Sequence, residues 1–108
     1  MNVVIKKTDK AQLVEVSGTI DGKTSPEIQT KLLGLVKEGG NIVLDMSKVE
    51  FMASAGLRIL LAVRRQLPAG GSFILTGLSE HIQETMSVTG FIDFFTCFDT
   101  TEQALASL

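Results

Sequence analysis

The regular alternation of short aliphatic runs with helix-like segments restricts the fold of this chain more than any other feature. Ile42–Leu44 and Phe73–Leu75 have the length and composition of strands that are buried on both faces. Between them, residues 54–67 form a largely apolar helical segment, which Pro68 and the pair Gly70-Gly71 bring to an end. Strands that alternate with helices of this length predict a mostly parallel sheet with right-handed crossovers.

The first twenty residues predict a hairpin that precedes this parallel unit. Two β-rich stretches, Val3–Ile5 and Leu13–Val16, are separated by Thr8–Lys10, a turn short enough for an antiparallel pair. A helix then begins near Thr24, with either a Thr24-x-x-Glu27 capping box or Ser25 as the cap and a proline in the first turn.

The C-terminal third predicts two further helices and one further strand. Ser79 is suited to cap a helix that ends at Gly90 in the left-handed conformation. The last strand is expected around Phe94, Phe95 and Phe98. Asp99 and Glu102 resemble a capping box for the last helix. We therefore expect a single α/β domain over residues 1–108, a mostly parallel mixed sheet with an N-terminal antiparallel hairpin strand and four helices.

Composition argues against nucleic acid, membrane insertion and secretion. The formal net charge is −2, and the chain has no Trp or Tyr on which bases could stack. The longest apolar run, Ile59–Val63, is much shorter than the roughly 20 residues that a bilayer requires. The N-terminus shows no secretion signal, and the single cysteine, Cys97, excludes an internal disulfide, so we expect a cytoplasmic protein.

The sequence contains no complete signature of an enzyme, a metal site or a cofactor site. Residues 52–56 lack the first glycine of a Gly-x-Ser-x-Gly elbow, and His81 is the only histidine available as a base. One histidine, one cysteine and scattered carboxylates offer no ligand pair at metal-binding spacing. We therefore expect a protein without catalytic activity, metal or cofactor.

Polar segments follow three of the predicted strands, and parallel strands send such segments to one edge of the sheet. These segments are residues 19–24, 47–54 and 76–79. Asp21, Ser54 and Ser79 are therefore expected to lie close together.

Ser54 has two interpretations from the sequence alone. It can be the N-cap of the helix that follows, or it can be a phosphorylation site, because free amides at a helix N-terminus accommodate a phosphate. Gly56 in the first turn lowers helix propensity, and small neighbours allow another backbone to approach. Arg58, one turn later, is placed to pair with a group on Ser54.

Four motifs together resemble a known family over nearly the whole chain. They are Ser17–Asp21, Ile42–Met46 leading to Phe51-Met52, Ser54–Leu61 and Thr89–Phe91. With these motifs the sequence resembles a stand-alone STAS domain of the bacterial anti-sigma factor antagonist family. It departs from the family pattern at Ala53, where Asp, Asn or Ser is common.

The resemblance implies a regulatory role in partner switching. In this family, the serine aligned with Ser54 is phosphorylated by an anti-sigma factor that is a serine kinase of the histidine-kinase-like ATPase superfamily. The unphosphorylated antagonist binds that kinase and frees the sigma factor, and a metal-dependent serine phosphatase resets the cycle. Asp21 matches a recurrent acidic residue beside the phosphoserine. The expected partner-binding residues of this chain, taken as a monomer, are Asp21, Thr24, Ala55, Gly56, Leu57 and Arg58.

Two other functions remain open from the sequence. Related domains serve membrane transport, so the chain can be a STAS accessory subunit that docks onto a transporter ATPase. It can also be a small-ligand or enzyme domain that uses a cleft at the carboxyl edge of the sheet, although the lack of paired acid and base groups counts against this.

Overall fold

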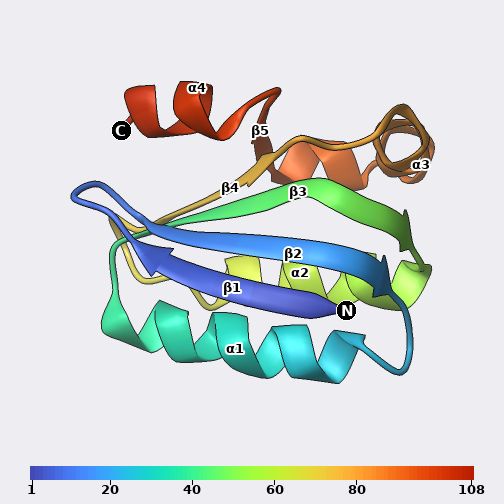
Figure 1. The fold of residues 1–108 in the computed structure, drawn as a ribbon, viewed down its shortest axis with the longest axis horizontal. Helices are drawn as coiled ribbons and strands as arrows, with labels where there is room; N and C mark the ends of the chain where they lie inside the picture. The colour runs from blue at the N-terminus through green and yellow to red at the C-terminus, as the bar shows by residue number, and fades with distance from the viewer.

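A five-stranded mixed sheet organises the chain, and the computed structural model describes all residues 1–108 (Figure 1). The strands are β1 (Asn2–Lys7), β2 (Gln12–Ile20), β3 (Asn41–Met52), β4 (Ser72–Thr76) and β5 (Thr96–Phe98). The helices are α1 (Ser25–Glu38), α2 (Ser54–Arg65), α3 (Glu80–Thr89), the 3-10 helix η1 (Phe91–Phe94) and α4 (Thr101–Ala106). The strands lie in chain order, β1 antiparallel to β2 and the others parallel, which confirms the predicted fold.

The main core lies between the sheet and the two long helices, α1 and α2, which cover the lower face in Figure 1. Their aliphatic side chains, such as Ile28, Leu32 and Leu60, are fully buried against inward residues of β2 and β3 such as Val14 and Leu44. None of the helices is long and apolar enough to cross a membrane.

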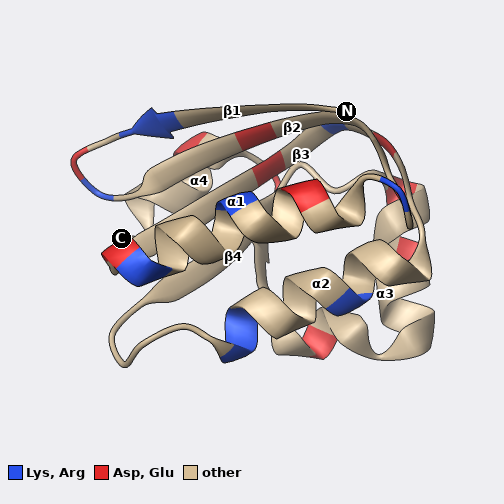
Figure 2. Cartoon of the chain, turned by 90° about the horizontal axis from the view of Figure 1, so that it is seen from below, with Lys and Arg blue, Asp and Glu red and all other residues tan.

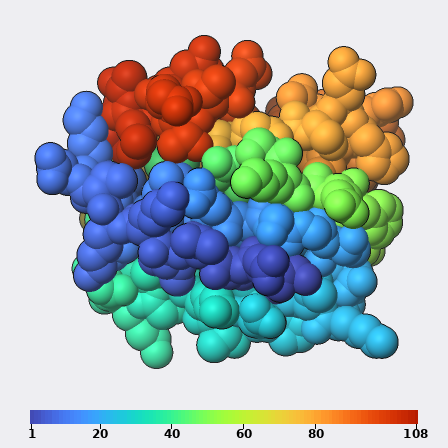
Figure 3. Space-filling model, in the orientation of Figure 1, coloured from blue at the N-terminus to red at the C-terminus, as the bar shows by residue number.

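The other face of the sheet is only partly covered. There α4 packs through Ala104 on Val43 and Ile74, near the amino ends of β3 and β4. Farther along β3, no helix packs on the strand as extensively as α4 does. The atoms of this part of β3, green in Figure 3, reach the surface below the orange α3. The outer face of the sheet is therefore open near the carboxyl end of β3.

Strand β3 is much longer than the sequence predicted. Residues 47–52, expected in a loop, continue the strand and pair with β2 as far as Ile20 opposite Met52. By contrast, the pairing of β3 with β4 ends at Asp45 opposite Thr76. The chain consequently leaves β4 beside Ser47, where a Cβ on Gly77 would lie 2.9 Å from the Ser47 amide nitrogen.

Several element boundaries differ from the predicted ones. Phe94 belongs to η1 and Phe95 to its end, so the last strand is shorter than expected. The capping box of α4 is formed by Thr100 and Gln103, because the helix begins at Thr101, one residue later than a cap at Asp99 requires. Helix α2 ends at Arg65 and not at residue 67. The Ser79 cap of α3 and the left-handed Gly90 at its end are both confirmed.

Candidate functional site

The carboxyl ends of β2 and β3 bring two of the predicted polar segments together. Ile20 and Met52 are paired at the ends of these strands, and the amide of Ala53 donates a 2.8 Å hydrogen bond to the Ile20 carbonyl. The Asp21 loop and the start of α2 at Ser54 therefore leave the sheet side by side. Ser79 follows β4, whose pairing with β3 ends at Thr76 opposite Asp45, whereas β3 continues to Met52. The ends of these two strands therefore do not bring Ser79 beside Ser54, and on this point the prediction was wrong.

Ser54 is the first residue of α2 and not its N-cap. The N-cap is Ala53, whose extended backbone has no side-chain oxygen to accept a bond from the first turn. The capping interpretation of Ser54 is therefore wrong, and its side chain is exposed. The Ala53 carbonyl accepts from the Gly56 amide at 2.9 Å, whereas the amides of Ser54 and Ala55 have no acceptor within the helix.

Replacing Ala53 by Asp is expected to stabilise the protein because it supplies the missing N-cap. An N-cap carboxylate accepts hydrogen bonds from first-turn amides and is attracted by the positive end of the helix dipole. Together these interactions stabilise the folded protein by about 1 kcal/mol. For a domain of this size, that corresponds to a rise of roughly 4 °C in melting temperature. Thermal unfolding of Ala53→Asp and Ala53→Leu, which has no capping oxygen, would test this; equal melting temperatures would contradict it.

The Asp21 loop is held rigidly by its own hydrogen bonds. Asp21 Oδ1 accepts from the amides of Lys23 at 2.9 Å and Thr24 at 3.0 Å. The Thr24 hydroxyl accepts from the Asp21 amide at 2.9 Å and donates to the Thr19 carbonyl at 2.8 Å. The amides of Thr24 and then Lys23 hold the pKa of Asp21 below its ordinary 3.8, because they bond to the charged form. Asp21 thus carries a fixed negative charge, and Thr24 shapes the loop.

The other predicted partner-binding residues divide between the surface and the core. Arg58 is exposed on a helix that has no acidic residue, and it takes part in neither of the two salt bridges (Figure 2). Ala55 is half-buried, whereas Gly56 is buried and Leu57 is only 2% exposed. Gly56 and Leu57 therefore support the site from beneath and cannot contact a partner while the helix stays packed.

Gly56 has a specific packing role under Ser54. A Cβ at this position would lie 2.7 Å from Cγ of Met52 and 2.8 Å from Cγ2 of Ile20, both of which are buried. Only glycine thus allows the first turn of α2 to rest this closely on the ends of β2 and β3. This contact fixes where Ser54 stands relative to Asp21.

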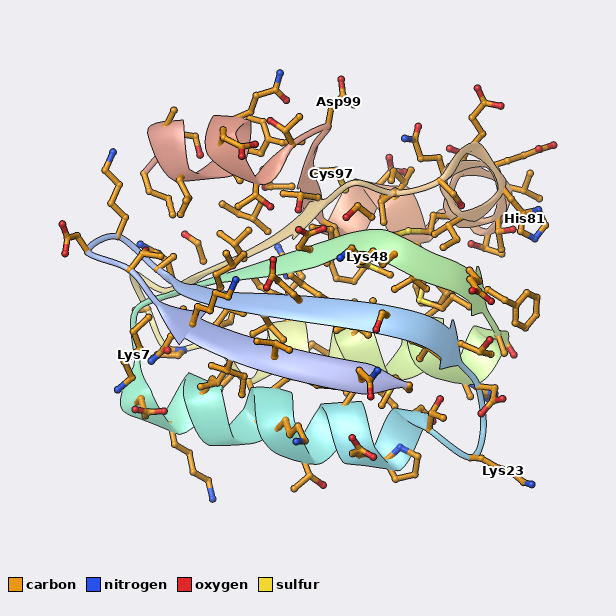
Figure 4. All side chains as sticks on the ribbon, in the orientation of Figure 1. Lys7, Lys23, Lys48, His81, Cys97 and Asp99 are labelled. Atoms are coloured by element: carbon orange, nitrogen blue, oxygen red, sulfur yellow. The ribbon has the colours of Figure 1, made fainter.

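Residues with other reactive side chains lie elsewhere. His81 extends outward from α3, and Cys97 lies in β5 (Figure 4). Burial raises the pKa of the Cys97 thiol, which makes it a poorer nucleophile at neutral pH. No group of three or more His, Cys, Asp or Glu side chains is placed to hold a metal ion.

Two hollows of the surface, each about 560 Å³, lie far from Ser54 along α2. Both are lined by Pro68, which follows the opposite end of that helix, and neither includes Asp21 or Ser54. The surface around Ser54 is consequently better suited to a macromolecule than to an enclosed small ligand.

Phe51 is a surface residue that was not predicted from the sequence. Its side chain is 46% exposed, although it stands in an apolar pair with Met52, which is 6% exposed. Alternation of inward and outward residues along a strand could have suggested that Phe51 and Met52 differ in exposure. The β-bulges that decide which of the two faces outward are visible only in the register of β2 and β3.

Comparison with known proteins identifies the family to which this fold belongs. The family model of the STAS domain matches residues 2–104. The anti-sigma-B factor antagonist of Bacillus subtilis is 29% identical over 94 residues, which cover 86% of each chain.

Solved structures show the same fold. An anti-sigma factor antagonist from Mycobacterium paratuberculosis superposes with a TM-score of 0.91 at 28% identity, over 98% of this chain and 92% of that one. The Bacillus cell fate determinant SpoIIAA in its phosphorylated form gives a TM-score of 0.73 at 21% identity, over 98% of both chains. The chain described here belongs to the STAS domain family, among the anti-sigma factor antagonists.

Proposed function

We propose that this protein is a non-enzymatic, cytoplasmic antagonist in a bacterial partner-switching system and that phosphorylation of Ser54 controls it. The unphosphorylated monomer binds an anti-sigma serine kinase of the histidine-kinase-like ATPase superfamily and releases the sigma factor. Phosphorylated protein no longer binds, and a serine phosphatase restores it. The observation that carries the proposal is the exposed Ser54 hydroxyl at the first position of α2.

The position of Ser54 suits a phosphoryl acceptor. Its Oγ is free to attack the γ-phosphorus of ATP, with ADP as the leaving group and the hydroxyl proton passing to a base of the kinase. The product phosphate would lie at the positive end of the α2 dipole, near amides that no side chain occupies. Phosphorylation can therefore leave the helix intact and act at the binding surface.

Asp21 and Arg58 give this surface a distinct charge pattern. Asp21 is ionised at neutral pH, and the amides of its loop hold the carboxylate in place. Arg58 is exposed on α2 without an ion-pair partner. A kinase that binds here would meet a fixed negative charge and a mobile positive one on the two segments beside the acceptor hydroxyl. Both residues then contribute to partner recognition.

An assay of phosphoryl transfer would test the proposal. Each histidine-kinase-like ATPase of the source organism would be incubated separately with ATP and this protein, and the product examined by intact-mass analysis. We expect one of these kinases to add a single phosphoryl group to the wild type and to Ser47→Ala, a control that removes an exposed hydroxyl of β3. Ser54→Ala should remain unmodified. Transfer to another residue, or no transfer by any of them, would contradict the proposal.

Replacement of Asp21 by Asn should separate charge from loop structure. The amide oxygen of Asn can keep the bonds from the Lys23 and Thr24 amides, while the negative charge is lost. We expect a melting temperature close to that of the wild type and weaker binding of the kinase, measured by calorimetry. Unchanged affinity would show that the charge of Asp21 does not contribute to kinase binding and that the residue only shapes the turn.

A further inference from the structure

Phe51 is a large aromatic side chain that the fold holds at the surface. In the register of β2 and β3, Gly18 lies opposite Val49 and the next residue, Thr19, lies opposite Phe51. Glu50 is therefore the extra residue of a β-bulge. Met52 faces the core and is 6% exposed, so its neighbour Phe51 faces the outer side of the sheet.

The fold leaves this aromatic ring only partly covered. Helix α4 packs on the outer face of the sheet through contacts with residues such as Val43 and Ile74, near the amino ends of the strands. Phe51 lies at the opposite end of β3 and remains 46% exposed. Its exposed surface is thus available to another molecule.

The distance between Phe51 and Ser54 is limited by the covalent chain. Ser54 is three positions after Phe51 in the sequence, so their Cα atoms lie at most about 11 Å apart. A protein interface of ordinary size buries about 800 Å² on each partner, the area of a disc of roughly 16 Å radius. A kinase that binds around Ser54 would consequently cover Phe51 as well.

We propose that Phe51 is an anchor residue for the kinase that binds and phosphorylates Ser54. This inference rests on the proposed function and names a determinant of partner recognition on the outer face of the sheet. Partly exposed aromatic residues near the centre of an interface contribute much of its affinity when an apolar pocket receives them. The kinase should therefore carry an apolar pocket beside the position of the acceptor serine.

Affinity measurements on matched phenylalanine variants would test the anchor. The probe is the kinase that phosphorylates the wild-type protein, loaded with ADP, with binding followed by calorimetry. Phe94, in η1, is 48% exposed and provides a control of equal chemistry and similar exposure on another element. We expect Kd to rise at least fivefold for Phe51→Ala and less than twofold for Phe94→Ala.

Two further measurements separate anchoring from misfolding. Phe51→Thr keeps a high strand propensity while removing the ring, and melting temperatures of all variants would show whether each is folded. For the folded variants, KM for this protein as a substrate should rise with little change in kcat, because the contact is made before and during phosphoryl transfer.

The outcomes distinguish this inference from the proposed function. If the kinase binds and phosphorylates Phe51→Thr and Phe51→Ala with less than a fivefold change in Kd, or if Phe94→Ala loses as much affinity, the anchor is overturned and the Ser54 switch stands. If no kinase phosphorylates the wild type at Ser54, the proposed function itself fails.

Discussion

Phosphorylation of Ser54 is expected to weaken binding of the ADP-loaded kinase at least tenfold without lowering the melting temperature. A phosphate adds about −1.5 to −2 charge at neutral pH, which takes the net charge of the protein from −2 to roughly −4. At the start of α2 this charge is favourable for folding by about 0.3–1 kcal/mol.

The same phosphate is unfavourable in a docked interface. It must lose water there, beside the fixed carboxylate of the Asp21 loop, and poor charge complementarity in an interface costs several kcal/mol. Since about 1.4 kcal/mol changes affinity tenfold, the loss in binding should exceed the small gain in folding.

Calorimetry with the phosphorylated and unphosphorylated proteins would measure this difference directly. Ser54→Asp carries one charge on a shorter side chain and should reproduce only part of the loss. Equal affinities of the two forms for the kinase would show that phosphorylation of Ser54 does not control binding.

Gly56→Ala is expected to destabilise the protein and to slow phosphorylation of Ser54. The added methyl group would meet Met52 Cγ and Ile20 Cγ2 at less than 3 Å, and crowding of this kind costs about 1–3 kcal/mol. The gain in helix propensity, up to about 1 kcal/mol, is smaller. Relief of the contact must move the first turn of α2, and a displacement of about 1 Å can reduce a rate up to a hundredfold.

Gly34→Ala provides the matched control, because Gly34 is exposed within α1 and a Cβ there would meet no atom within 4 Å. That substitution should stabilise the protein by roughly 0.5–1 kcal/mol and leave phosphorylation unchanged. Denaturant unfolding and kinase kinetics of both variants would test the comparison. A Gly56→Ala protein as stable and as rapidly phosphorylated as Gly34→Ala would show that close packing under Ser54 is unimportant.

The order of strands and helices could be predicted because it depends on local patterns. The hairpin, the parallel strands and the helices follow from apolar periodicity and from residues that start or end elements, such as Ser79 and Gly90. These signals act within a few residues of one another. A single chain therefore contains enough information to identify the elements and the α/β class.

The position of Ser54 beside the Asp21 loop was only partly predictable. The parallel topology indicated that both follow strand ends at one edge of the sheet, and the hydrogen bond between Ala53 and Ile20 joins those ends. The same reasoning failed for Ser79, because β3 extends well beyond its last pair with β4. Strand length depends on pairing with β2, which local sequence does not reveal.

Local sequence patterns indicate which helices and strands form, whereas long-range packing selects which of their faces meet. The register of β2 and β3, with its bulges, turns Met52 into the core and Phe51 to the surface. It also places the first turn of α2 so close to the strand ends that only glycine is accommodated at position 56. These features depend on contacts between residues more than thirty positions apart, such as Ile20 and Met52, and packing energy across the sheet selects them.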